Sequence, residues 1–253
     1  MRWLKGVENM VVILVGLTIA LLVALDVLIR WRMARRAKPG AVSAVPGMDL
    51  LLVSLQPERF SLPGGLFFHR GHTWVNLLFS GQVKVGVDDF LQRLLGCADA
   101  ITLPPVGVEV REGQPFVNIR QGGRTATLAS PVDGVVCAVN SDLAKAPGLL
   151  RRDPYTRGWL VALRPTNLSA NLMQLKVGES AMAWLRAEVA RLQEFLRVTL
   201  SQKREAQVGV TAADGGLVAD GLLEHLDDET WNTFQWEFIA PESWHGDRKS
   251  PFW

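Results

Sequence analysis

The chain has 253 residues, a formal net charge of +2 and a high apolar fraction, which is enough for one or two domains with a buried core. A charge this close to zero gives no overall electrostatic reason to bind nucleic acid. The two cysteines, Cys97 and Cys137, lie far apart without CxxC spacing, so they cannot form a metal site alone and no disulfide can be inferred. We expect both to be reduced and packed.

The first predicted element is an apolar run at residues 10–29, which a helix would extend over roughly 30 Å, the thickness of a bilayer core. We interpret it as a transmembrane anchor, with Asp26 at the interface. A cleaved signal peptide is the alternative, because residues 41–44 read AVSA, but a basic stop-transfer flank comes first: Arg30, Arg32, Arg35, Arg36 and Lys38. That flank predicts a single-pass inner-membrane protein whose main domain faces the cytoplasm.

Short strands punctuated by glycine and proline follow the anchor. Residues 39–65 form a predicted linker and lead-in, and Ser80-Gly81 marks a hairpin between the segments HTWVNLLF and QVKVGV. A short helix is expected after Asp88, with Gly96 as its stop. Further strand candidates continue to residue 168. Many short strands with one short helix predict a mainly β domain, a small barrel or sandwich, over residues 66–168.

The last part of the chain is predicted to be helical. Residues 169–205 hold an amphipathic helix with one apolar stripe, formed by Met182, Leu185, Val189, Leu192 and Leu196. Such a stripe packs on its own domain or on a partner, and the pattern alone leaves both open. In residues 206–253, Asp227 or Asp228 could cap a short helix ahead of a tryptophan-rich tail.

The stretch IRQGGRTATLASPVDG, residues 119–134, predicts two strands joined by a tight glycine turn. Upstream lie HTWV and an aspartate-initiated helix that ends in Leu-Gly, and downstream lies RRDPYTRGWLVALRP. Together, in this order, these segments resemble the H-protein of the glycine cleavage system over residues 66–168. The resemblance implies a lipoyl-carrier fold of the barrel-sandwich hybrid type.

The family's functional residue is missing from this turn. In the family the hairpin reads Glu-Ser-x-Lys, and the lysine carries lipoate through an amide bond. Ungapped alignment from Pro131 puts Gly123 at the place of that lysine, and Arg120 and Gln121 at the places of the glutamate and serine. Arg124 cannot substitute, because a guanidinium stays protonated and is no acyl acceptor. We therefore predict no lipoyl attachment and no cofactor.

Other polar residues of the pattern are expected to be structural. Asp88 and Asp89 suit an N-cap and a first-turn carboxylate. His72, at a strand start, has no second histidine or cysteine near it in sequence, so we expect a hydrogen-bonded residue rather than a metal ligand. The sequence contains no nucleophilic triad, phosphate-binding loop or metal motif. It predicts a protein that is not an enzyme.

Three functions fit these observations. The first is a membrane-anchored, non-catalytic scaffold or accessory subunit that meets other protein subunits through the predicted tip: Arg120, Gln121, Gly122, Gly123 and Arg124. The second is a working carrier in glycine-cleavage-like one-carbon transfer. The third is a membrane-fusion adaptor of a transport system, which the tight turn disfavours because those adaptors resemble a lipoyl domain split by a long helical hairpin. The sequence names neither the partner complex nor a ligand.

Overall fold

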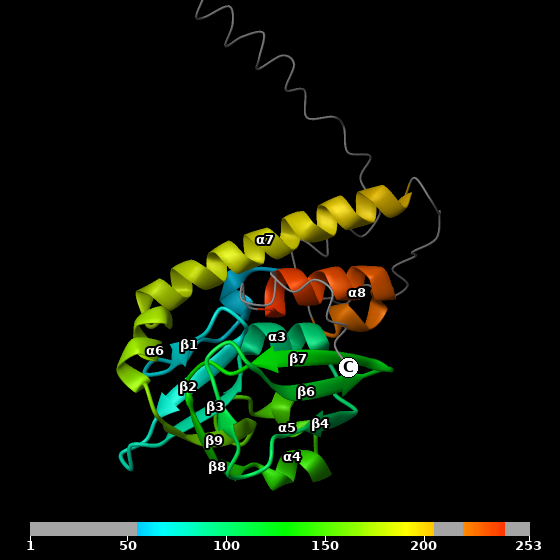
Figure 1. The fold of residues 1–253 in the computed structure, drawn as a ribbon. Helices are drawn as coiled ribbons and strands as arrows, with labels where there is room; N and C mark the ends of the chain where they lie inside the picture. The colour runs from blue at the N-terminus through cyan, green and yellow to red at the C-terminus, as the bar shows by residue number, and fades with distance from the viewer. Residues whose placement is uncertain (1–54, 205–219, 241–253) are drawn as a thin grey trace, which may run out of the picture. The chain divides into compact units, whose positions relative to one another are not determined.

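The structure is a computed structural model that describes residues 55–204 and 220–240. Its strands form two sheets, covered by helices from the second half of the chain (Figure 1). The strands are β1 (Phe67–Phe68), β2 (Thr73–Leu77), β3 (Val83–Val87), β4 (Ala100–Thr102), β5 (Glu109–Val110), β6 (Pro115–Gln121), β7 (Arg124–Ala129), β8 (Gly134–Val139) and β9 (Trp159–Pro165). The α-helices are α3 (Asp89–Leu95), α4 (Ser141–Lys145), α5 (Leu149–Arg152), α6 (Leu168–Gln174), α7 (Glu179–Arg204) and α8 (Asp228–Phe234). Two short 3₁₀ helices, η1 (Pro57–Arg59) and η2 (Leu222–His225), and a π-helical stretch, η3 (Gln235–Ile239), complete the set of described helices.

Among the described residues the larger sheet has the strand order β1-β2-β3-β9-β8-β5, and the smaller has the order β4-β6-β7. All the pairings are antiparallel, as expected for short strands joined by tight turns. The predicted hairpin at Ser80-Gly81 is β2–β3, in which Thr73 pairs with Val87 and Leu77 with Val83. The mainly β sandwich that the sequence predicts is confirmed.

The core lies between the two sheets and continues under the helices. Alternation along β6 and β7 sends one side chain in two inward, so that Val117, Ile119, Ala126 and Leu128 are all buried. From the other sheet, Val85 and Val161 are fully buried in the same cluster. Because each sheet buries one face against the other, the strands form a two-layer sandwich.

Helix α3 begins and ends where the sequence predicts. Asp88 is its N-cap, and the carboxylate accepts a hydrogen bond from the backbone N–H of Leu91 at 2.9 Å. Gly96 ends it with φ of 77°, a backbone conformation that favours glycine. Four of its apolar side chains are buried in the core: Phe90, Leu91, Leu94 and Leu95.

The stripe of α7 packs on its own chain. Leu185, Val189, Leu192 and Leu196 are buried in the main core, and Met182 is half-buried at the start of the helix. The pattern left open whether this stripe faces a partner. In the structure the stripe packs against residues of this chain, including the C-terminal segment described next.

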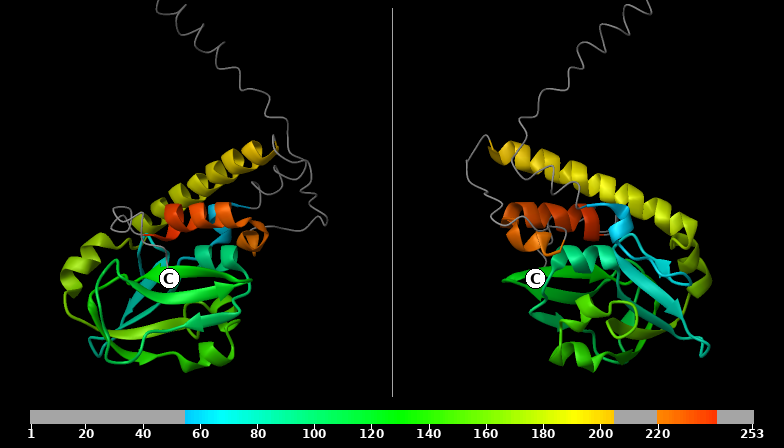
Figure 2. Two further views of the ribbon diagram at one scale, coloured as in Figure 1. Left: turned by 45° about the vertical axis from the view of Figure 1, so that its right-hand side comes forward. Right: turned by 180° about the vertical axis from the view of Figure 1, so that it is seen from behind.

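Residues 220–240 form a short C-terminal segment that lies between α7 on one side and α3 with β7 on the other (Figures 1 and 2). Asp227 caps α8, accepting from the Thr230 backbone N–H at 3.0 Å, as one of the two sequence alternatives predicts. Trp231, Phe234 and Phe238 are buried, and Phe195 of α7 packs edge-on against both phenylalanine rings. The segment therefore completes the core beneath α7.

The predicted fold class needs one correction, because it included a transmembrane helix. No helix of residues 55–204 or 220–240 combines the length and the apolar character needed to cross a bilayer. Helix α7 has 26 residues, but charged side chains such as Arg186 and Arg191 alternate with its apolar stripe, which suits one buried face rather than a lipid environment. The predicted span, residues 10–29, lies outside the described residues, and the inner-membrane localisation that rested on it stays a prediction from the sequence.

Candidate functional site

The tip of the β6–β7 hairpin is a two-residue turn made of glycine alone. Gln121 pairs with Arg124, and Gly122 and Gly123 between them have φ of 54° and 85°. Two consecutive positive φ values define the type I′ turn, whose twist matches that of antiparallel strands and which glycine adopts without strain. A Cβ at either glycine would meet nothing within 4 Å, so the tip itself points into open space.

The nearest lysines before and after the hairpin in the sequence, Lys84 and Lys145, both lie in other elements. Lys84 lies in the middle of β3, paired with Asn76 and Ala162, and its ammonium lies 5.1 Å from the centre of the Trp159 ring. Lys145 is the last residue of α4. Since no lysine stands between these two in the sequence, the hairpin presents no primary amine.

Strand alternation divides the five predicted tip residues into two groups. Gln121 and Arg124 follow the inward series of Ile119 and Ala126, whereas Arg120 points outward and is exposed. Gln121 is 5 % exposed, and Arg124 is half-buried. The sequence placed all five residues on one docking surface, but the fold leaves only Arg120, Gly122 and Gly123 facing solvent.

Arg124 is held by the C-terminal segment. Its Nε donates to Asp228 Oδ1 at 2.9 Å, and its Nη1 donates to the backbone carbonyl of Leu223 at 3.1 Å. The guanidinium carbon also lies 5.8 Å from the centre of the Trp231 ring, within the range of a cation–π contact. Both the charge and the planar group of this arginine are therefore engaged within the chain.

Gln121 and the turn are held in the same way. Gln121 Nε2 donates to Glu224 Oε1 at 3.1 Å, and that same oxygen accepts from the Cys97 backbone N–H at 3.0 Å. On the β4 side, the Gly122 N–H donates to Asp99 Oδ2 at 2.7 Å. Sequence reasoning missed the acidic partners Glu224 and Asp228, because they lie about a hundred residues further along the chain.

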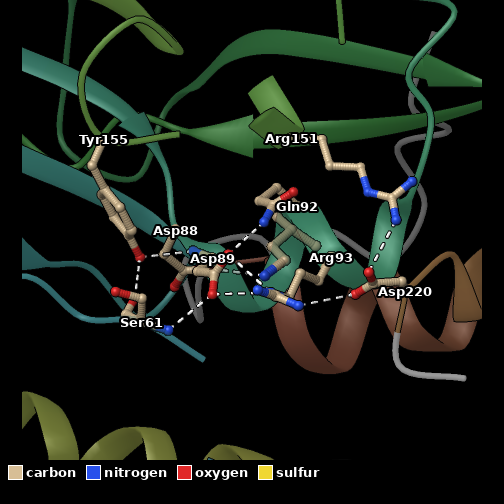
Figure 3. A network of polar contacts seen from close by, with 9 residues as sticks. Ser61, Asp88, Asp89, Gln92, Arg93, Arg151, Tyr155 and Asp220 are labelled. Carbon is tan, nitrogen blue, oxygen red and sulfur yellow. Dashed lines mark hydrogen bonds and ion pairs between the residues drawn. The ribbon is translucent and has the colours of Figure 1, made fainter. Parts of the chain in front are cut away.

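The acid pair of α3, Asp88 and Asp89, takes part in a network of hydrogen bonds and ion pairs (Figure 3). Asp89 accepts from the Ser61 backbone N–H at 2.8 Å and from Arg93 Nε at 3.0 Å. Its own N–H donates to the Tyr155 hydroxyl, which donates in turn to the Ser61 carbonyl. This network ties the lead-in before β1, helix α3 and the loop before β9 together.

The same network continues to the C-terminal segment. Arg93 Nη1 and Arg151 Nη2 lie 3.3 Å and 3.0 Å from the two carboxylate oxygens of Asp220 (Figure 3). The hydrogen bond to Asp220 is the main cause of a raised pKa of Arg151. One aspartate thus joins α3 and α5 to the beginning of the segment.

His72 is a buried structural residue, in agreement with its interpretation from sequence. Its Nδ1 lies 2.8 Å from Asp88 Oδ2, and its ring stacks on Phe90 with 4.5 Å between the ring centres. The backbone has φ of 60°, a left-handed conformation that histidine adopts more readily than most residues. The residues described contain no group of three or more histidine, cysteine or acidic side chains placed to hold a metal.

The two cysteines are free thiols, but the expectation that both are packed is wrong for Cys97. Cys97 is exposed, 4.0 Å from Arg151 Nη1, and Cys137 is half-buried with its thiol donating to the Ala162 carbonyl. Neither lies at the hairpin tip, so neither supplies a nucleophile in the place of the missing lysine.

Comparisons with known proteins give the family. Residues 66–188 match the glycine cleavage H-protein family. A "Probable glycine cleavage system H protein" of Thermococcus kodakarensis is 34% identical over 133 residues, which cover 53% of this chain and 98% of that protein. A glycine cleavage system H protein of Mycolicibacterium smegmatis is 38% identical over 103 residues, covering 41% of this chain and 79% of that protein. The crystal structure of an H protein from Mycobacterium marinum is 26% identical, with a TM-score of 0.43 and coverage of 48% of this chain and 96% of that one. The chain belongs to the glycine cleavage H-protein family.

Proposed function

We propose that this chain is a non-catalytic H-protein-type subunit that carries no lipoyl group and acts through protein–protein contacts of its hairpin. The observation that carries the proposal is the turn between Gln121 and Arg124, which consists of two glycines. Amide attachment of lipoate needs an amine nucleophile at the tip, and neither glycine has a side chain to provide one. Arg124 stays protonated and is bound to Asp228, so it does not provide one either.

The docking surface we propose is the outer side of the hairpin. Arg120 is exposed there, one residue before the buried Gln121, beside the open Gly122-Gly123 turn and the exposed Thr125. A guanidinium pairs with a carboxylate through two parallel hydrogen bonds, and its planar fork fixes the orientation of the partner. We therefore expect a partner subunit with an acidic residue facing the tip.

Intact-mass measurement of the protein purified from its native host tests the first half of the proposal. The expected mass is that of the unmodified chain, and an added lipoyl group would overturn the proposal. The second half is tested by native capture of companion proteins with the wild type, Arg120→Glu and the control Arg164→Glu. Arg164 is an exposed arginine at the end of β9, in the other sheet. A companion lost with Arg120→Glu and kept with Arg164→Glu supports docking at the tip.

The second candidate is a working carrier of the glycine cleavage type, which membership of the H-protein family favours. It would need attachment at a residue outside the hairpin, and the same mass measurement, followed by peptide mapping, would find it. The third candidate, a membrane-fusion adaptor, requires a long helical hairpin between the two strands. Only Gly122 and Gly123 stand between β6 and β7, so we do not propose it.

A further inference from the structure

The inner side of the hairpin is covered by residues 220–240, which lie outside the part of the chain that matches the H-protein family. We propose that this segment acts as an intramolecular ligand of the hairpin: it occupies the inner side of the tip permanently and excludes external proteins from it. The inference rests on the proposed function, in that it concerns the same hairpin. It adds that only the outer side is open to partners.

The polar contacts of the segment are spread over three acidic residues, each of which binds a different part of the tip's surroundings. Asp220 binds Arg93 and Arg151 beside α3, and Asp228 binds Arg124 at the start of β7. Glu224, between them, binds Gln121 at the end of β6. These contacts fix the segment in one register along the hairpin and α3.

Shape complementarity supports the same register. The Gly221 N–H donates to the Arg93 carbonyl at 2.7 Å, so η2 lies directly against the C-terminal end of α3. At that contact, a Cβ added to Gly96 would come within 2.8 Å of the Gly221 Cα, closer than real Cβ atoms approach. The missing side chain at Gly96 therefore lets the two backbones meet.

The apolar contacts decide how firmly the segment is held. Leu223, Phe234 and Ile239 are 0% exposed, and Phe234 stacks on Phe238 with 4.8 Å between the ring centres. Burial of such side chains contributes more to stability than ion pairs at the surface do. The ion pair of Asp228 with Arg124 is of the surface kind, because the Asp228 side chain is 87% exposed. The segment is therefore a fixed part of the fold, which salt alone would not release.

The covered inner side limits any enzyme or partner that has to contact the residues on both sides of the tip. Gln121, two positions before the place of the family's lysine, is buried beneath Glu224, and Arg124, immediately after it, is bound to Asp228. A lysine restored at Gly123 would project into open space, but the strand residues beside it would be unavailable on their inner side. We expect such a lysine to be a poor substrate for lipoylation as long as the segment stays in place.

The experiment uses the full chain with Gly123→Lys, incubated with lipoate ligase, lipoate and ATP, and follows the intact mass over time. A second variant adds Phe234→Ala, which removes a buried ring from the segment, and a matched control adds Val198→Ala, which removes an exposed apolar side chain from α7. Hydrogen exchange of residues 220–240 on the same samples shows whether the segment has loosened. Where Phe234→Ala does not keep its folded near-UV circular dichroism, Phe234→Leu replaces it.

We expect the loosened variant to be lipoylated at least tenfold faster than Gly123→Lys alone, and the Val198→Ala control to match Gly123→Lys. Equal rates in the loosened and unloosened variants, whether fast or undetectable, overturn the inference. The proposed function fails on a different result, namely a lipoyl group on the native wild-type chain or a companion protein that ignores Arg120→Glu. The two failures are therefore distinguishable.

Discussion

Asp88 Oδ2 lies 2.8 Å from His72 Nδ1, with both side chains completely buried, so one carboxylate joins the start of β2 to the first turn of α3. Its other oxygen, Oδ1, caps the helix through the Leu91 N–H. Each carboxylate oxygen of Asp88 thus makes a different contact, one with His72 and one with the Leu91 N–H. Losing the side chain breaks two connections at once.

Asp88→Ala is expected to lower the free energy of unfolding by about 2–4 kcal/mol, from a lost cap of ~1 kcal/mol and an unsatisfied buried histidine nitrogen of ~1–3 kcal/mol. Asp88→Asn keeps an oxygen that can cap the helix, so we expect a smaller loss. Urea denaturation of the three proteins measures the difference. A loss under 1 kcal/mol for Asp88→Ala would show that the pair contributes little.

Leu192→Ala should cost about 2–5 kcal/mol, because it opens a cavity in a fully buried stretch of the α7 stripe. The matched change Val198→Ala, on an exposed side chain of the same helix, should stay within about 0.5 kcal/mol of the wild type. Thermal and urea denaturation of the purified chain, without any partner, make the comparison. If Leu192→Ala were neutral there, the stripe would not be packed on its own chain.

Tyr155, the single tyrosine of the chain, is expected to resist ionisation in the folded protein. Burial raises its pKa well above the ordinary value of 10.0, and the nearby carboxylates of Asp88 and Asp89 act in the same direction. A raised folded-state pKa means that the contribution of Tyr155 to stability is complete below about pH 10 and is lost as the pH rises further. Tyrosinate absorbance should therefore appear only together with unfolding, and an independent titration near pH 10 would contradict the raised pKa.

Tyr155→Phe removes the hydroxyl that accepts from the Asp89 N–H and donates to the Ser61 carbonyl. The backbone groups left without a partner should cost about 1–3 kcal/mol at neutral pH. The alkaline loss of stability should also become less steep than in the wild type, as followed by circular dichroism at increasing pH. An unchanged alkaline profile would assign that loss to other groups.

Asp133 should make the fold sensitive to acid. Burial of the carboxyl would by itself raise its pKa, but hydrogen bonds from the Glu112 N–H and from the Asn171 and Asn167 amides lower the pKa overall. A lowered folded-state pKa gives stability that is present above the unfolded value of about 3.9 and is lost as the pH falls through the folded value. Asp133→Asn should thus be less stable than the wild type at pH 7, with the difference shrinking below about pH 4. Glu109→Gln, on an exposed strand residue, is the control and should not change the acid profile.

The amino-acid sequence determined those features that depend on residues close together in the chain. Short segments bounded by turn residues predicted the strands, and the pair Gly122-Gly123 predicted a two-residue turn without a lysine. Asp88 predicted the start of one helix, and Asp227 was one of two candidates for the start of another. Each of these follows from local backbone chemistry, namely capping, pleating and positive φ. The ordered set of such motifs was also enough to indicate the family.

Only the tertiary structure decided which residues surround the tip. A pattern read along the chain shows that Arg124 is charged, but not that Asp228, 104 residues later, binds it. In the same way, the α7 stripe shows that a helix face needs cover, but not that Phe234 and Phe238 supply part of it. Pairings of this kind depend on how distant segments meet in the folded core, and no local preference specifies them. The division of the hairpin into an occupied inner side and an open outer side is therefore a property of the fold.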